Sequence, residues 1–168
     1  MRKILIATAA GAAVMAATGA YAASTVTTTF QVTATVLKTC SVSATALLFG
    51  NYTPGAGAVN GTSTVSVNCT KTTPYSVALN GGTTTGGTVA QRLMANGANS
   101  LQYNLYTTVA DTTVWGDGTG VSVTQSGVGA GVATANNLTV FGNLPDNATN
   151  QAAVPGSYSD TVTVTVTY

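Results

Sequence analysis

Charged residues are scarce in this sequence, and two kinds of ionisable side chain are missing. The 168-residue chain has no histidine and no glutamate, and its charge comes from five Lys and Arg residues and four Asp residues. Without histidine, neither a Ser-His-Asp triad nor a Cys-His pair can be built. The aspartates are isolated from one another in the sequence, and single aspartates in loops usually form turns. The sequence therefore predicts that the protein is not an enzyme.

The sparse charge also limits the kinds of partner. The formal net charge is +1, and no basic patch for nucleic acid or polybasic segment for a membrane surface can be assembled. Thr, Ser, Asn and Gly would form the polar surface instead. Such a surface lacks the self-repulsion that keeps monomers apart. It favours a protein that associates over a plain secreted monomer.

No group of residues has the spacing of a cofactor or metal site. The stretch Trp115–Gly118 places an aspartate between glycines but lacks the ligand series of a calcium loop. The glycines between 81 and 87 are not followed by the Gly-Lys-Ser/Thr of a phosphate-binding loop. Two cysteines, without histidine, cannot fill the four positions of a zinc site. We expect no cofactor and no metal.

Residues 1–22 have the pattern of a secretory signal peptide. Arg2 and Lys3 form a short basic region, an Ala-rich apolar segment begins at Ile4, and residues 20–22 read Ala-Tyr-Ala, a small-x-small cleavage pattern. A membrane anchor is the alternative, but the apolar run is short, is interrupted by Thr and Gly, and precedes no stop-transfer pattern. Cleavage before Ala23 would export a mature chain whose length suits one domain.

The two cysteines, Cys40 and Cys69, form an even pair in a chain expected to be exported. Such a pair predicts one disulfide bond. It would close a loop of about 30 residues and stabilise the fold by roughly 3–4 kcal/mol on chain-entropy grounds.

Apolar and polar residues alternate along several short segments, which is typical of half-buried β-strands. The longest cases are Val26–Val36, near the mature N-terminus, and Ser157–Tyr168, at the end of the chain. No mature segment has a helical spacing of useful length, and Gly, Pro and Asn turns separate the segments. Many short strands of this kind predict an antiparallel β-sandwich. Further expected strands are residues 62–69, 75–79, 101–106 and 138–142.

Several short motifs follow one another along the mature chain. They are Cys40 after the alternating N-terminal segment, Phe49-Gly50, residues 65–69 (VSVNC), residues 75–82 (YSVALNGG), Arg92-Leu93, residues 101–106 (LQYNLY), residues 140–142 (VFG) and residues 156–168 (GSYSDTVTVTVTY). In this order and spacing, the motifs resemble the spore coat protein U domain family, which includes pilins of archaic chaperone–usher pili.

The resemblance implies an all-β fold, an incomplete immunoglobulin-like antiparallel β-sandwich that lacks its last strand. A periplasmic chaperone would lend that strand first, and the N-terminal segment of the next subunit would replace it in the fibre by donor-strand exchange. Residues 23–36 would then be the donor strand, and residues 37–168 the pilin domain. The donor face would consist of Val26, Thr28, Phe30, Val32, Ala34 and Val36, of which Thr28 and Ala34 are small and imply shallow pockets. One wall of the acceptor groove would consist of Val162, Val164, Val166 and Tyr168.

The function implied by the resemblance is that of a structural subunit of a cell-surface pilus, an organelle of adhesion or biofilm formation. Its partners would be neighbouring pilin subunits, a periplasmic chaperone and an outer-membrane usher, and not nucleic acid. The family also includes spore coat proteins, so a spore or cell-coat structural protein is the alternative. A carbohydrate-binding or adhesin module is a third possibility, and the lack of a second domain as a receptor-binding head argues for a shaft subunit.

Overall fold

The computed structural model describes residues 22–168, in two parts that are considered separately, residues 22–35 and residues 36–168. All of the expected signal peptide except Ala22 lies outside the described residues. Residues 22–39 form neither helix nor strand. The elements that follow are β1 (Cys40–Ala44), β2 (Val59–Cys69), β3 (Pro74–Leu79), β4 (Arg92–Asn96), β5 (Asn99–Tyr106), β6 (Gln125–Val128), β7 (Asn136–Leu144), α1 (Ala148–Gln151) and β8 (Val164–Thr167).

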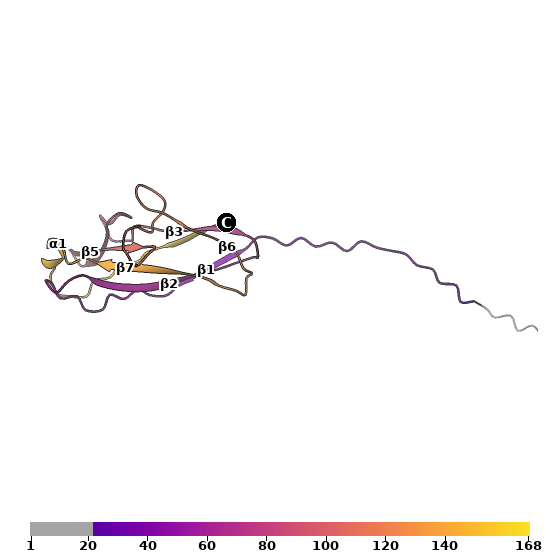
Figure 1. The fold of residues 1–168 in the computed structure, drawn as a ribbon, viewed down its shortest axis with the longest axis horizontal. Coiled ribbons are helices and arrows are strands. Elements are labelled where there is room, and N and C mark those ends of the chain that lie inside the picture. Colours follow the sequence, from indigo (N-terminus) through magenta and orange to yellow (C-terminus); the bar gives the residue numbers. More distant parts are fainter. Residues whose placement is uncertain (1–21) are drawn as a thin grey trace, which may run out of the picture. The chain divides into compact units, whose positions relative to one another are not determined.

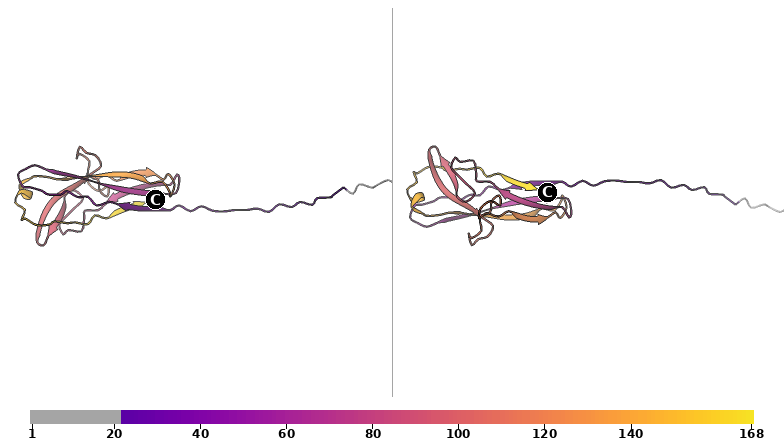
Figure 2. Two further views of the ribbon diagram at one scale, coloured as in Figure 1. Left: turned by 90° about the horizontal axis from the view of Figure 1, so that it is seen from below. Right: turned by 90° about the horizontal axis from the view of Figure 1, so that it is seen from above.

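The strands form two antiparallel sheets, which confirms the predicted all-β sandwich. One sheet has five strands in the order β1-β2-β7-β5-β4, and the other has three in the order β6-β3-β8. Figure 1 shows α1 at one end of the domain and the C-terminus at the other, and Figure 2 shows β7 and β8 on opposite sides. β1 and β8 are therefore edge strands, one in each sheet.

The predicted disulfide is present and joins β1 to β2. Cys40 lies directly opposite Cys69 in the antiparallel register, and their sulfur atoms are 2.01 Å apart. Cys69 is fully buried. The bond therefore fixes the outer strand of the five-stranded sheet at the point where the chain enters the domain.

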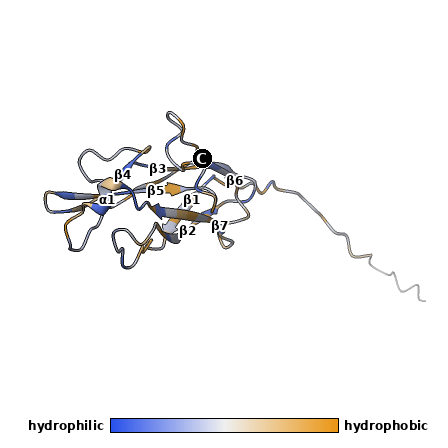
Figure 3. Cartoon of the chain, turned by 60° about the vertical axis from the view of Figure 1, so that its left-hand side comes forward, coloured by the Kyte–Doolittle hydropathy of each residue, from blue (hydrophilic) through white to orange (hydrophobic). Residues whose placement is uncertain are grey.

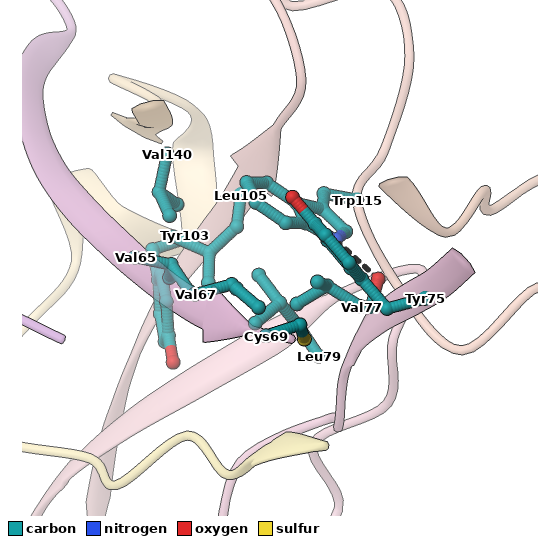
Figure 4. Packing of buried hydrophobic residues seen from close by; sticks show 10 residues of the cluster. All are labelled: Val65, Val67, Cys69, Tyr75, Val77, Leu79, Tyr103, Leu105, Trp115 and Val140. Atoms are coloured by element: carbon teal, nitrogen blue, oxygen red, sulfur yellow. Dashed lines mark hydrogen bonds between the residues drawn. The ribbon is translucent and has the colours of Figure 1, made fainter. Parts of the chain in front are cut away.

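The core forms between the inner faces of the two sheets. Burial alternates along β2 and β3, and Figure 3 shows polar and apolar residues mixed along single strands. Trp115 is completely buried, and its indole Nε1 donates a hydrogen bond to the Val77 carbonyl at 3.0 Å. Each buried aliphatic side chain stabilises the fold by about 1.5–3 kcal/mol. Figure 4 shows the cluster, which consists of Val65, Val67, Cys69, Tyr75, Val77, Leu79, Tyr103, Leu105, Trp115 and Val140.

Arg92 is buried in this core although it is charged. Its guanidinium donates to the carbonyl oxygens of Asn80 and Trp115, both at 2.9 Å, and to Oδ1 of Asn104 at 2.6 Å. Burial lowers the pKa of Arg92 from its usual value. A buried charge is tolerated only when its hydrogen-bonding groups are satisfied, and here Arg92 ties β4 to the end of β3.

Three segments differ from the sequence-based expectation. Of the alternating stretch 157–168, only β8 is a strand, because Ser159 bonds with Ala95 and the ladder with β3 starts further on. Residues 26–36 alternate but form no strand within this single chain, since alternation specifies two faces but a strand also needs ladder hydrogen bonds. No helical spacing of useful length was found in the mature chain, yet residues 148–151 form the short helix α1, whose N-cap Asn147 accepts from the Asn150 amide.

Candidate functional site

The candidate site is a groove between the edge strands β1 and β8. β1 pairs with β2 alone, and β8 pairs with β3 alone, so each has one backbone edge without a strand partner in residues 36–168. Beyond β1, the chain runs on through Thr45 to Phe49 without forming a strand. Unpaired edges present free N–H and C=O groups that can pair with an added strand.

The groove has a volume of about 450 Å³ and an apolar floor. Its floor is the core itself, with Val65, Leu79, Leu105 and Val140 below the opening. One wall is residues 44–49, and the other is residues 158–164. The first wall continues from β1 of the five-stranded sheet, and the second leads into β8 of the three-stranded sheet, so the opening lies between the two sheets.

Two glycines set the position of the first wall. Gly61 and Gly142 lie opposite each other in the β2–β7 register. A Cβ atom at Gly142 would lie 2.7 Å from Leu47 Cδ1, and one at Gly61 would lie 2.8 Å from the Leu48 carbonyl oxygen. Real side chains cannot approach so closely, so the glycines let Leu47 and Leu48 lie against the sheet. Thr45 adds a bond, since its Oγ1 accepts from the Thr64 amide at 2.9 Å.

The second wall contains two of the four residues predicted for it, Val162 and Val164. Val162, Val164 and Val166 share one partly buried face and pack against the core, and the threonines between them are exposed. Val162 and Val164 line the groove. Tyr168 is 56% exposed and lines a separate hollow beside Pro74.

Asp160 holds this second wall in place. Its carboxylate accepts hydrogen bonds from the Tyr103 hydroxyl at 2.7 Å and from the amides of Thr83 and Thr84 at 2.9 and 3.1 Å. Burial by itself raises the pKa of Asp160, but these hydrogen bonds outweigh it and hold the pKa below its ordinary value. A Cβ atom at Gly82, whose φ is +89°, would overlap the Asp160 carboxylate, so glycine is required there on two grounds.

Sequence reasoning missed this role of Asp160 because its partners are about 57–77 positions away in the sequence. Leu47 and Gly142 are likewise distant in the sequence. One local signal for Asp160 was available. It is a charged residue at an even-numbered position of the alternating segment, on the face where Val162 and Val164 point inward.

The predicted donor residues form an exposed apolar face on the N-terminal stretch. Val26, Phe30 and Val32 expose 98%, 86% and 80% of their surface, and Val36, which belongs to the second part, exposes 87%. Thr28 and Ala34 are also exposed. Large apolar side chains exposed in one contiguous segment are typical of interaction sites.

No group of three or more His, Cys, Asp or Glu residues within residues 22–168 could hold a metal ion. Across the same range, no helix combines the length and the apolarity needed to cross a membrane. What the site offers is two unpaired backbone edges above an apolar floor.

Comparisons with known proteins point in the same direction. The model of the Spore Coat Protein U domain family matches residues 26–165. A chain in the crystal structure of the CsuC–CsuE chaperone–tip adhesion subunit pre-assembly complex, from archaic chaperone-usher Csu pili of Acinetobacter baumannii, matches with a TM-score of 0.53 and 25% sequence identity. That match covers 80% of this chain and 41% of the other. Among curated proteins, no sequence matches.

Proposed function

Since the chain belongs to the Spore Coat Protein U domain family, we propose that it is a structural subunit of a cell-surface pilus that polymerises by donor-strand complementation. Residues 23–36 act as the donor strand, and the domain of residues 37–168 carries the acceptor groove. The observation that carries this proposal is the apolar groove between two edge strands, in a chain whose N-terminal stretch exposes apolar side chains at all but one of the even-numbered positions from 26 to 36. The protein is exported through the periplasm to the cell surface.

The direction of the inserted strand follows from steric considerations. Cys40 and Thr167 lie at the same end of the domain, since their partners Cys69 and Ser76 are separated by a short turn. Each copy's own donor stretch leaves from that end. A donor parallel to β8 would finish there and crowd the incoming domain against the outgoing stretch. A donor antiparallel to β8 finishes at the other end, so the contact repeats head to tail and builds a filament.

The register of the donor strand against residues 158–168 follows from the lengths of the two segments and from which of their positions face inward. The stretches Val26–Val36 and Tyr158–Tyr168 have equal length, and in both of them the inward positions are even-numbered. Full antiparallel overlap places Phe30 opposite Val164 and Val32 opposite Val162, at the open part of the groove. Burial of Phe30, Val32 and Val36 at roughly 1.5–3 kcal/mol each supplies about 5–9 kcal/mol before entropy costs.

The two small donor residues also suit this register. Ala34 falls opposite Asp160, where a larger apolar side chain would press on the hydrogen-bonded carboxylate. Thr28 falls opposite Val166, in the part of the sandwich where β1 and β8 are in contact and little space remains.

The binding partners are proposed from the need to cover the apolar groove before assembly. The matched crystal structure is of a chaperone bound to a tip adhesion subunit before assembly. For the present chain, a periplasmic chaperone covers the groove first, an outer-membrane usher receives the complex, and a neighbouring subunit then replaces the chaperone. This order protects an apolar surface that would otherwise aggregate.

Deletion of Ser24–Val36 tests the proposal. The deleted subunit should still co-purify with its chaperone, because its groove is intact, but it should form no fibres. Phe30→Asp should have the same effect, whereas Gln31→Asp, on the outward face of the same stretch, should leave fibres intact. Electron microscopy and the yield of sedimented fibres report assembly. Normal fibres from the deleted chain would refute the proposal.

A further inference from the structure

A second hollow adjoins the groove at the end of the domain that carries α1. It has a volume of about 760 Å³ and lies between residues 47–54 and residues 153–158. It shares five lining residues with the groove, Leu47, Leu48, Phe49, Met94 and Tyr158. Leu48 is 78% exposed and Val154 is 49% exposed, so the rim of the hollow is apolar.

Hydrogen bonds hold both sides of this hollow. On one side, Asp146 accepts from the Tyr52 hydroxyl at 2.6 Å and from the amides of Gly55 and Gly57 at 3.0 and 2.9 Å. On the other side, the Tyr158 hydroxyl donates to the Val154 carbonyl at 2.7 Å. The hollow is therefore a preformed feature of the domain, and not a gap left by a loose loop.

We propose that this hollow receives Leu37 of the next copy of the chain, so that successive subunits meet at a second contact beyond the donor strand. The proposal rests on the proposed function, because it takes the direction and register of the donor strand from it. In that register Val36 lies opposite Tyr158, and Leu37 lies just past it, beside Ser157. The hollow begins at the same place, since residues 153–158 form one of its sides.

Leu37 is suited to this position by its parity and by its neighbours. It is apolar and 77% exposed, and it falls on the face of the stretch opposite to the donor residues, so the groove cannot take it. It precedes Cys40 by three residues, which span at most about 10 Å. The disulfide of Cys40 then anchors the next domain. A leucine in so short a connection must lie close to the surface of the preceding subunit.

The same contact between subunits brings together two residues of opposite charge, Lys38 and Asp146. Lys38 is the one charged residue between positions 23 and 70. Asp146 lies beside the hollow, through its bond with Tyr52, and these hydrogen bonds hold the pKa of its carboxyl below the ordinary value, so it is ionised at neutral pH. With Leu37 seated in the hollow, Lys38 follows within reach of that carboxylate. The contact restrains the angle between subunits in the fibre.

Paired cysteine substitutions in the full-length protein test the contact. Leu37→Cys combined with Ser157→Cys should form a disulfide between neighbouring copies under mild oxidation, seen as a ladder on boiled, non-reducing gels of fibres. Leu37→Cys combined with Thr165→Cys is the control, because Thr165 is exposed on β8 and about eight residues, or roughly 27 Å, further along the wall. Intact fibres without a ladder from the first pair, or equal ladders from both, would overturn the inference.

A measurement on unsubstituted fibres covers the case in which cysteine variants fail to assemble. Trypsin cleaves after Lys38, and the bond should be protected in fibres but cut in the chaperone-bound subunit. Leu37→Ser should leave fibres assembled and raise the cleavage rate about tenfold or more, since the burial of one leucine is worth at least a factor of ten in an equilibrium. Equal cleavage of both fibres would overturn the second contact and leave donor-strand assembly standing. A failure of the unsubstituted chain to form fibres would overturn both.

Discussion

The Tyr103 hydroxyl donates a 2.7 Å hydrogen bond to Oδ2 of Asp160, and this bond joins the floor of the groove to its second wall. Tyr103 lies on β5 of the five-stranded sheet, and Asp160 lies in the segment that leads into β8 of the other sheet. One carboxylate thereby connects the two layers beside the opening. The position of the wall depends on a polar contact as well as on the packing of its valines.

Asp160→Asn is expected to lower the free energy of unfolding by about 1–2 kcal/mol. The substitution keeps the size of the side chain but removes the charge that accepts several hydrogen bonds, and such bonds to charged groups contribute about 1.5–3 kcal/mol before allowance for partial exposure. Trp115, the single tryptophan and fully buried, reports unfolding in urea by its fluorescence. Asp111→Asn is the control, and equal urea midpoints for the two variants would contradict the role given to Asp160.

Stability is expected to be flat between pH 5 and 8 and to fall below about pH 4. Hydrogen bonds from Thr119 lower the pKa of Asp117, those from Tyr52 lower that of Asp146, and that of Asp160 is lowered despite its burial. A depressed carboxyl pKa gives stability that is present above the unfolded value, 3.8, and is lost as the pH falls through the folded value. No histidine titrates in between.

Urea midpoints measured across this pH range check the expectation. The urea midpoint of Asp160→Asn should fall less at acid pH than that of the unsubstituted protein, because one carboxyl group with a lowered pKa has been removed. A stability transition between pH 5 and 8, or a midpoint unchanged down to pH 2, would show that the aspartates are not the groups responsible.

The sequence was most informative where the signal is local. Alternation with a period of two identified the cores of β2, β3, β5 and β7, and an even cysteine pair in a chain expected to be exported identified the disulfide. Alternation also placed Val162, Val164 and Val166 on one face. It did not show where β8 begins, because the end of a ladder depends on the neighbouring strand and not on the strand's own pattern.

Features that depend on distant residues could not be predicted. Arg92 was known only as part of a short motif, and its burial depends on carbonyls from Asn80 and Trp115 that the fold brings around it. Leu47 and Gly142 are far apart in the sequence, and nothing in either segment indicates their contact. The helix α1 spans four residues, which is too short for a helical period to be recognised.

Replacement of both cysteines by alanine is expected to destabilise the protein by about 3–4 kcal/mol, because the disulfide closes a loop across 29 positions. It also frees the outer strand β1, so assembly should decline with stability. The control replaces Ser41 and Asn68, the adjacent pair in the same register, by alanine. Urea midpoints and fibre yield measure both effects. A loss no greater than that of the control pair would contradict the structural role of the bond.

Gly142→Ala is expected to push Leu47 out of position and to reduce both stability and fibre yield. The new Cβ atom would lie 2.7 Å from Leu47 Cδ1 and 3.1 Å from Phe49 Cζ, so the first wall of the groove must move. Overpacking of this kind costs about 1–3 kcal/mol. The effect on assembly should exceed that of an equally destabilising change elsewhere in the core, because Leu47 and Phe49 line the groove itself.

A double-mutant cycle with Leu47→Ala separates this steric effect from a general loss of stability. Leu47→Ala alone removes apolar contacts and should also destabilise the protein, but it clears the space that the new methyl group at position 142 needs. The double variant should therefore be more stable than the sum of the single effects predicts, with a coupling of about 0.5–3 kcal/mol, as is typical for residues in contact. If the two changes in unfolding free energy were strictly additive, Gly142 would be needed for a reason other than the packing of Leu47 against it. The glycine pair would then have no special part in shaping the groove.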